Sequence, residues 1–210
     1  MVAEVRANCA DKDAADIILF LGLTGLRWGE LSALRVRDVA ELPVPALRVT
    51  QTKTDGHVTR TQTNGGSART VPLMGDAADI ATARRNGSPN DLLFPNVRGG
   101  NRNDANFKRA IKWTEVSRGR RLHDLRHTAA TNWLANGVDV KAAQAWLGHS
   151  TATLTLDTYG HWMPSADTAA IERMNAVLSQ VRGAHGVLDS ISDLSNGSHK
   201  NKRVQQITGL

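Results

Sequence analysis

The spacing of apolar and polar residues changes twice along this 210-residue chain. Over most of it, apolar residues recur three and four positions apart, which predicts helices. The predicted helices span residues 13–24, 28–36, 76–85, 103–116, 122–135, 140–147, 150–159 and 166–181. In the middle, β-branched residues alternate with polar ones, which predicts an antiparallel meander of about three strands. These strands are 47–53, 57–63 and 68–73, with Asp55-Gly56 and Gly65-Gly66 as the turns between them.

The sheet interrupts the series of helices and does not alternate with them. This order argues against a doubly wound fold and predicts a mainly α protein with a small antiparallel β-meander (α+β). Helix ends are expected at Gly25, at Asn136-Gly137 and at Gly148, where the backbone can turn left-handed. After Arg182, Gly, Ser, Asn and Lys dominate. We therefore expect a folded domain over residues 1–182 and a flexible tail over 183–210.

The positive charge of the chain is concentrated in one segment. The sequence has 26 Lys and Arg against 20 Asp and Glu, a net charge of +6. Between Arg84 and His127 there are eleven basic and four acidic residues, so this segment carries +7 and the remainder −1. Such clustering is typical of a surface that binds an anionic polymer.

Several classes of protein are excluded by what the sequence lacks. Cys9 is the only cysteine, which excludes an internal disulfide and a Cys-based zinc site. No apolar run approaches the roughly 18 residues of a membrane span, and residues 17–23 lack the flanks of a signal peptide. We expect a cytoplasmic protein associated with the nucleoid rather than with a membrane.

Four short strings contain residues that could take part in catalysis or bind a ligand. They are TGLRWGEL (24–31), HDLRHT (123–128), LGHS (147–150) and DTYGH (157–161). In the second string, the three-residue spacing puts His123 and Arg126 on one face of a helix. Arginines can bind the non-bridging oxygens of a phosphodiester, and histidines such as His149 can donate to the same oxygens or move a proton. A phosphodiester therefore suits this set, with Arg27 and Arg126 as its cations.

A tyrosine hydroxyl can attack phosphorus and hold it covalently, and Tyr159 is the only tyrosine of the chain. No carboxylate pair suited to magnesium is evident, and the arginines would make a metal unnecessary. We therefore expect neither a metal nor another cofactor.

The four strings resemble the motif boxes of tyrosine recombinases, also called phage-type integrases. The resemblance runs from about Asp13 to Arg173, keeps the order of the boxes, and implies the DNA breaking-rejoining catalytic fold. It implies that Arg27, His123, Arg126 and His149 surround the scissile phosphate. It further implies that Tyr159 forms a 3′-phosphotyrosyl link, without ATP, and that Glu30 supports the site. The N-terminal core-binding domain of the family is expected to be absent from this chain.

One element departs from the family pattern, which places a lysine in the sheet as the acid that protonates the leaving 5′-oxygen. Counting back from Ser67 and Arg69-Thr70-Val71-Pro72-Leu73, this position falls on Thr63. The meander has one lysine, Lys53, ahead of the earlier turn. Either Lys53 serves from a differently registered hairpin, or the acid is missing or supplied otherwise.

Other readings of the same residues are less specific. His123 and His127 could bind zinc, but Arg126 between them would repel a cation, and His127 is expected to support the helix. His161 and Trp162 follow the tyrosine closely enough to reach the site. Phosphate contacts are expected from the basic segment, foremost from the residues before the His-x-x-Arg helix. The candidates are Arg118, Arg120, Arg121, Lys108, Arg109 and Lys112.

The leading hypothesis is the catalytic domain of a tyrosine-type site-specific recombinase for phage or prophage DNA integration or excision. Its expected partners are double-stranded attachment sites and other copies of the chain, as a homotetramer on DNA and a monomer when free. A type IB topoisomerase would use similar chemistry. A catalytically impaired DNA-binding or regulatory fragment is the alternative that the doubtful lysine favours. A metal-dependent hydrolase is a third class, which would lose activity with a chelator.

Overall fold

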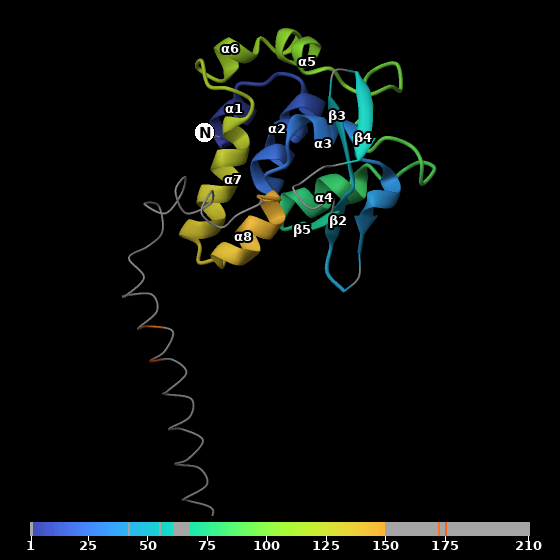
Figure 1. Ribbon diagram of the computed structural model, residues 1–210. Helices are drawn as coiled ribbons and strands as arrows, with labels where there is room; N and C mark the ends of the chain where they lie inside the picture. Colours follow the sequence, from blue (N-terminus) through green and yellow to red (C-terminus); the bar gives the residue numbers. More distant parts are fainter. Residues whose placement is uncertain are drawn as a thin grey trace, which may run out of the picture. The chain divides into compact units, whose positions relative to one another are not determined.

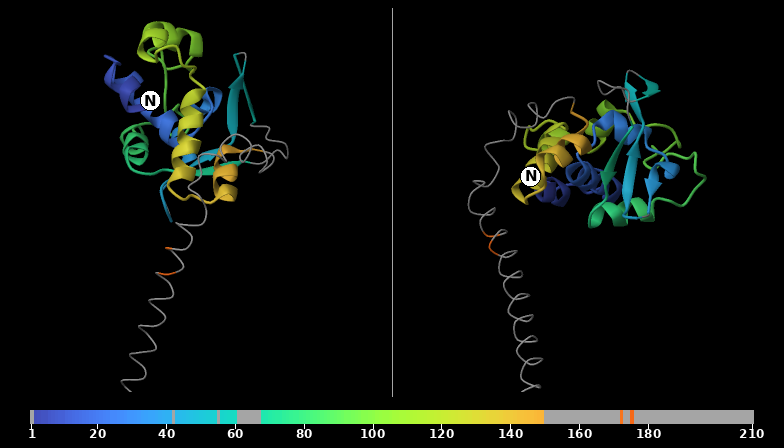
Figure 2. Two further views of the ribbon diagram at one scale, coloured as in Figure 1. Left: turned by 90° about the vertical axis from the view of Figure 1, so that its left-hand side faces the viewer. Right: turned by 60° about the horizontal axis from the view of Figure 1, so that its bottom comes forward.

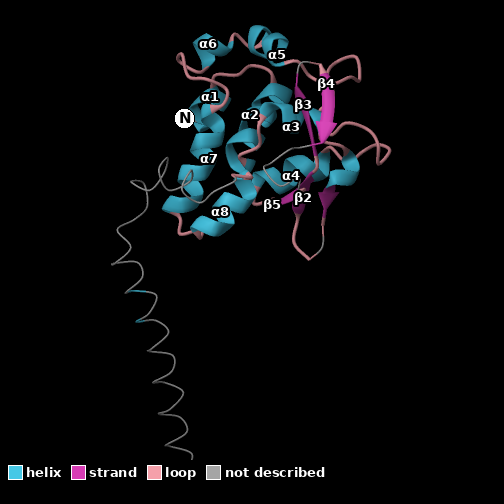
Figure 3. Cartoon of the chain, viewed as in Figure 1, coloured by secondary structure: helices cyan, strands magenta, loops and turns pink. Residues whose placement is uncertain are grey.

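The computed structural model describes residues 2–41, 43–54, 56–60 and 68–149, together with residues 172 and 175. The chain divides into units 1–163 and 164–210, and residues 172 and 175, both helical, belong to the second. In the first unit, a group of helices lies beside two small antiparallel sheets (Figures 1 and 3). Its helices are α1 (Val2–Ala7), α2 (Lys12–Thr24), α3 (Trp28–Ala33), the 3₁₀ turn Val36–Asp38, α4 (Asp76–Ala83), α5 (Asp104–Ala110), α6 (Trp113–Val116), α7 (Asp124–Ala135) and α8 (Val140–Leu147). Its strands are β1 (Val39–Ala40), β2 (Ala46–Val49), β3 (Gln51–Thr54), β4 (His57–Arg60) and β5 (Arg69–Pro72). The expected α+β class is confirmed.

Helix α2 forms the centre of the core. It packs against α1, α4 and α7, and Ile17, Ile18 and Phe20 are fully buried. Asp11 caps its first turn by accepting hydrogen bonds from the amides of Asp13 and Ala14. Gly25 ends it in the left-handed conformation, as the sequence predicts. No helix in the described part of the chain is long and apolar enough to cross a membrane.

The strands do not form the single meander expected from the sequence. One sheet has the order β1-β2-β5, with Leu47 opposite Val71, and the hairpin β3–β4 is a separate sheet with Lys53 opposite Val58. The run 47–53 is therefore two strands that part at Thr50. The reason lies in packing: β2 is mostly buried in the core, whereas β3 is half-buried and packs on α3 (Figure 2).

Two helical expectations also need correction. The predicted helix 103–116 is broken into α5 and α6 at Lys112, whose φ of 51° is left-handed. Residues six positions apart lie on different faces of a straight helix, so the break is what lets both Phe107 and Trp113 reach the core. The short helix α1 was not predicted at all; its Val2 and Val5 face α2, where Gly22 leaves room for Val2.

The remaining helices in the described part follow the pattern closely. Helix α8 has the predicted bounds, and Gly137 and Gly148 are both left-handed where helix ends were expected. The predicted helices 150–159 and 166–181 and the tail 183–210 lie outside the described residues, apart from 172 and 175. The domain boundary at residue 182 stays a prediction.

Replacing Gly29 by alanine should test the packing of α3 on β3. A Cβ at Gly29 would lie 2.4 Å from the Lys53 carbonyl oxygen and 2.7 Å from Thr52 Oγ1. Helix propensity alone would stabilise alanine by about 1 kcal/mol. Overpacking against a backbone atom costs about 1–3 kcal/mol, so we expect a net loss of stability in urea unfolding. The control Gly100→Ala, whose Cβ would meet nothing closer than 3.5 Å, should stay within about 0.5 kcal/mol of wild type. Equal stability of the two variants would contradict this packing.

Candidate active site

Arg27 sits at the turn between α2 and α3, and Glu30 fixes it. The Glu30 carboxylate accepts a hydrogen bond from the Arg27 amide at 2.8 Å, in the manner of a capping box. It also pairs with Arg27 Nη1 at 3.2 Å. Glu30 is buried, whereas the Arg27 side chain is 41% exposed. Glu30 thus fixes the backbone of Arg27 and one side of its guanidinium, while the side chain remains accessible to a ligand.

Glu30 has a second partner that the sequence did not single out. Arg69, the first residue of β5, donates from both terminal nitrogens to the two carboxylate oxygens, at 2.6 and 2.7 Å. Burial alone would raise the pKa of Glu30, but the bonds from Arg69 and the charges of Arg69 and Arg27 hold it below its usual value. The carboxylate is therefore ionised at neutral pH.

Arg126 joins two distant segments of the chain. It lies in α7 and is 2% exposed. Its Nη1 donates to the Gly25 carbonyl at 2.7 Å and its Nη2 to the Leu147 carbonyl at 2.5 Å. Gly25 is two residues before Arg27 and Leu147 two residues before His149, so Arg126 ties these two motif strings together. Its expected contact with a phosphate stays a prediction.

His149 follows the left-handed Gly148 at the end of α8. Its amide donates to the Gln144 carbonyl, and the Gln144 side chain donates back to the His149 carbonyl, both at 3.2 Å. Burial, and then the charges of Arg126, Arg27 and Arg69, lower the pKa of His149 from 6.5 to about 4. The imidazole is therefore neutral at pH 7 and can donate one N–H to an oxygen.

His123 immediately precedes α7, one turn before Arg126. Its ring packs edge-on against His127, with 5.1 Å between centroids. The supporting role of His127 stays a prediction. The pKa of His123 is lowered by partial desolvation and by the charges of His127, Arg126 and Arg27. Arg27 and Arg126 lie close enough to both His123 and His149 for their charges to lower the pKa values of the two imidazoles. Among the described residues, no three His, Cys, Asp or Glu side chains come together as a metal site.

Lys53 lies on the strand that borders the Arg27 helix. Its carbonyl oxygen is in contact range of Gly29, two residues after Arg27. Its role in catalysis stays a prediction. Thr63, Tyr159, His161 and Trp162 lie outside the described residues.

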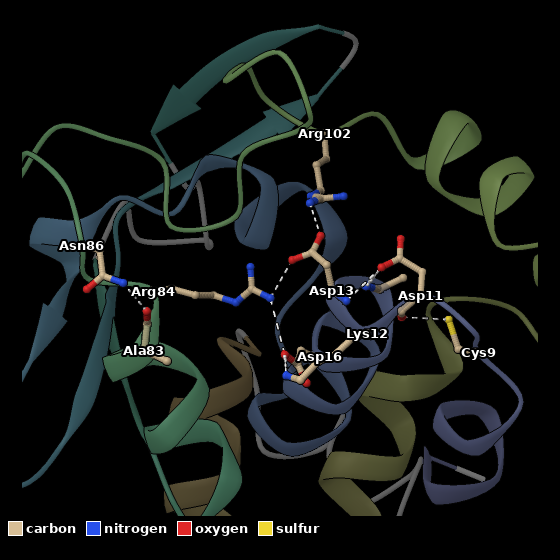
Figure 4. A network of polar contacts seen from close by, with 10 residues as sticks. Cys9, Asp11, Lys12, Asp13, Asp16, Ala83, Arg84, Asn86 and Arg102 are labelled. Carbon is tan, nitrogen blue, oxygen red and sulfur yellow. Dashed lines mark hydrogen bonds and ion pairs between the residues drawn. The ribbon is translucent and has the colours of Figure 1, made fainter.

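The basic segment is partly neutralised by acidic residues from other elements. Arg84 binds Asp13 at 2.6 Å, and Arg102 also pairs with Asp13 (Figure 4). Arg118 and Arg120 share the carboxylate of Glu4 on α1, at 2.7 and 3.4 Å. The net charge of +7 therefore overstates the charge that this segment offers to a ligand.

The DNA-contact candidates differ in how they are engaged. Arg121 pairs with Asp124 at 3.4 Å, Lys108 pairs with Asp104 at 2.9 Å, and Arg109 bonds to Asn106. Lys112 is exposed at the break between α5 and α6. Of the six candidates, all but the half-buried Lys108 are exposed. Their contact with DNA stays a prediction.

A family model described as the phage integrase family matches residues 1–165. The chain belongs to this family. It is 28% identical over 169 residues to the integrase of Haemophilus phage HP1, covering 79% of this chain and 42% of the relative. It is 32% identical over 154 residues to tyrosine recombinase XerC of Corynebacterium efficiens, covering 69% of this chain and 44% of the relative. The chain thus spans less than half the length of these two curated relatives.

Solved structures show the same fold. The catalytic domain of bacteriophage HP1 integrase matches with a TM-score of 0.56 at 24% identity, covering 81% of this chain and 89% of that one. The Tn1549 transposon integrase, in complex with circular intermediate DNA, matches with a TM-score of 0.61 at 24% identity, covering 82% and 63%. The fold is that of a tyrosine recombinase catalytic domain, as the resemblance in the motifs implied.

The pKa of His149 should make the stability of the protein fall on mild acidification. In the unfolded chain this histidine takes up a proton near pH 6.5, but in the folded protein only near pH 4. The unfolded state therefore binds more protons in between, and the free energy of unfolding decreases from about pH 6.5 toward pH 4. His149→Gln should flatten this slope in urea unfolding between pH 6.5 and 4.5. An unchanged slope would mean that His149 titrates normally in the folded protein.

Proposed function

We propose that this chain is the catalytic part of a tyrosine-type site-specific DNA recombinase. The observation that carries the proposal is the placement of Arg27: an accessible guanidinium, held by a buried carboxylate, beside imidazoles whose pKa values are lowered. Such a set of groups favours an oxyanion as ligand. Membership of the family and the motif order support the same activity.

Each side chain has a part in phosphoryl transfer under this proposal. Arg27 and Arg126 stabilise the negative charge that grows on the non-bridging oxygens in the pentacoordinate transition state. His123 and His149 donate N–H groups to the same oxygens, and either can move a proton. Preorganised donors of this kind contribute about 2.7–4 kcal/mol each in other enzymes, which fits a reaction without a metal.

The reaction conserves the energy of the phosphodiester. The Tyr159 hydroxyl gives its proton to a base of the site, such as His123 or His149, as its oxygen attacks phosphorus. The bond from phosphorus to the 5′-oxygen breaks, and an acid of the site donates a proton to the leaving oxygen. The products are a 3′-phosphotyrosyl bond and a free 5′-hydroxyl. A 5′-hydroxyl of a partner strand then attacks the phosphotyrosine and restores both a phosphodiester and the tyrosine, so that no ATP is consumed.

The partners follow from the proposed reaction. We propose double-stranded attachment sites as substrate, a homotetramer on paired sites, a free monomer, and a cytoplasmic location with the DNA. The Tn1549 integrase was solved in complex with DNA, which supports DNA as the ligand. Arg118 and Arg120 already share the Glu4 carboxylate, whereas Lys112 is exposed at the break between α5 and α6, so phosphates would compete with Glu4 at the two arginines.

Trapping of a covalent adduct tests the proposal directly. The substrate is a pool of nicked duplexes whose central sequence is randomised. After cleavage, the short strand that carries the 5′-hydroxyl dissociates and cannot attack the phosphotyrosine, so the protein stays attached to the DNA. Wild-type chain should yield a protein–DNA adduct stable to denaturation, and Tyr159→Phe should yield none while binding DNA equally well. If neither protein forms an adduct, or both do, Tyr159 is not the nucleophile, and a DNA-binding fragment or another chemistry remains.

Lys53 can be tested as the acid with a substrate whose leaving group needs no proton. Lys53→Ala should slow adduct formation on an ordinary phosphodiester, and a 5′-bridging phosphorothiolate should restore the wild-type rate because a thiolate leaves unprotonated. Arg48→Ala, an exposed basic residue of β2, is the control. Loss of activity that the phosphorothiolate does not restore would remove Lys53 from this role.

A further inference from the structure

Arg69 occupies a buried position between two motif strings that are more than a hundred residues apart in sequence. It begins β5 and is 9% exposed. Its two terminal nitrogens bind the Glu30 carboxylate, and its Nε donates to the Trp146 carbonyl at 2.7 Å. Glu30 belongs to the Arg27 string, and Trp146 lies three residues before His149.

We propose that Arg69 is a positioning residue for the cleavage reaction, which holds His149 through the end of α8 and keeps Arg27 available through Glu30. The proposal rests on the function proposed above. Arg69 does not need to touch the phosphate. Its bonds go to Glu30, which binds Arg27, and to the Trp146 carbonyl, which lies three residues before His149.

On the α8 side, the argument concerns the free carbonyls that every helix has at its C-terminus. The carbonyls of Gln144 and Ala145 accept the amides of Gly148 and His149. Those of Trp146 and Leu147 accept Arg69 Nε and Arg126 Nη2. Two cations thus complete the last turn, where the helix dipole favours positive charge. Since His149 follows this turn directly, its imidazole is placed by a helix end that the two arginines fix.

On the Glu30 side, the argument concerns competition for one carboxylate. Glu30 Oε1 receives Arg69 Nη1 at 2.6 Å and Arg27 Nη1 at only 3.2 Å, while Oε2 receives Arg69 Nη2 and the Arg27 amide. Arg69 therefore takes the close bidentate pair, and Arg27 keeps a single long contact. Without that pair, the buried carboxylate would draw the Arg27 guanidinium onto itself and away from a phosphate.

Only arginine meets these demands at once. The planar guanidinium offers two parallel N–H groups to Glu30 and a third, Nε, to the Trp146 carbonyl in the same plane. A lysine keeps the charge but has one nitrogen, so it cannot hold the fork and the carbonyl together. Arg69→Lys therefore removes the positioning while keeping the charge.

The matched control is Arg84→Lys. Arg84 also forms a close ion pair, with Asp13 at 2.6 Å, and its guanidinium stacks on Phe94 at 4.8 Å. It contacts the first turn of α2, whereas the site lies beyond the last turn of this 13-residue helix, roughly 18 Å away at 1.5 Å per residue. Both variants should lower Tm, but only Arg69→Lys changes contacts with Glu30 and the end of α8.

The first measurement is single-turnover cleavage of a duplex enriched by covalent capture, well below the Tm of every variant. Arg69→Lys should form the adduct at least tenfold more slowly at saturating protein, with its Kd for the duplex within twofold of wild type. Arg84→Lys should cleave at the wild-type rate. A wild-type rate for Arg69→Lys, or an equal loss in both variants, would overturn the proposal. Should Arg69→Lys melt too low, all three proteins are measured at a lower temperature at which every variant is folded.

The second measurement needs no activity, so it separates this proposal from the proposed function. In NMR spectra of the free protein, Arg69→Lys should shift the imidazole signals of His149 and leave those of His57, on the exposed hairpin, in place. Arg84→Lys should shift neither. Unchanged His149 signals in Arg69→Lys would overturn the positioning role, whereas a wild-type protein that forms no adduct would overturn the recombinase proposal and leave this result standing.

Discussion

The site depends on two buried guanidiniums that end on the same helix terminus. Arg69 and Arg126 are both almost inaccessible to solvent, and a buried charge is tolerated only when its donors are bound. Arg126 binds the carbonyls of Gly25 and Leu147, and Arg69 binds Glu30 and the Trp146 carbonyl. Removing either one would leave carbonyls, and in the case of Arg69 a carboxylate, buried without their partners. The α2–α3 turn, β5 and α8 are therefore held in one arrangement by the cost of leaving polar groups unpaired.

The arginines of the protein fall into two groups, those paired with carboxylates in or near the interior and those available to a ligand. Arg69, Arg84 and Arg102 are paired with Glu30 and Asp13 in or near the interior, where they stabilise the fold. Arg27 is the motif arginine that reaches the surface, since its carboxylate partner is engaged more closely by Arg69. Net charge along the sequence cannot distinguish these uses, because the acidic partners lie up to about ninety residues away in the chain.

The sequence predicted those parts of the molecule that depend on local rules. Helix α8 could be bounded from its apolar spacing and Gly148, and the family was identified from four short strings. The division of 47–53 into β2 and β3 could not be predicted, because it depends on which strand finds a partner in the core and which packs on α3. The break at Lys112 is likewise set by the burial of Phe107 and Trp113.

The role of Arg69 could not be predicted for the same reason, although its string Arg69-Thr70-Val71-Pro72-Leu73 fits the family pattern. Within the strand it reads as one polar residue of an alternating run, and only its register with the buried Val71 hints that it points inward. Its partners Glu30 and Trp146 are 39 and 77 residues away. The string shows that an arginine is expected at this position, but only the tertiary contacts show what it binds.

The electrostatic balance of the site explains why it suits an anion. Burial and, after it, the charges of Arg126, Arg27 and Arg69 oppose protonation of His149 and lower its pKa to about 4. A phosphodiester oxygen placed among these groups adds negative charge where three positive charges act, which offsets that opposition and raises the pKa of the imidazole. The bound phosphate would thus cancel the part of the shift that the arginines cause, and His149 would take up a proton more readily than in the free protein. Proton uptake would then be coupled to occupancy of the site, because the anion acts on the same fixed cations.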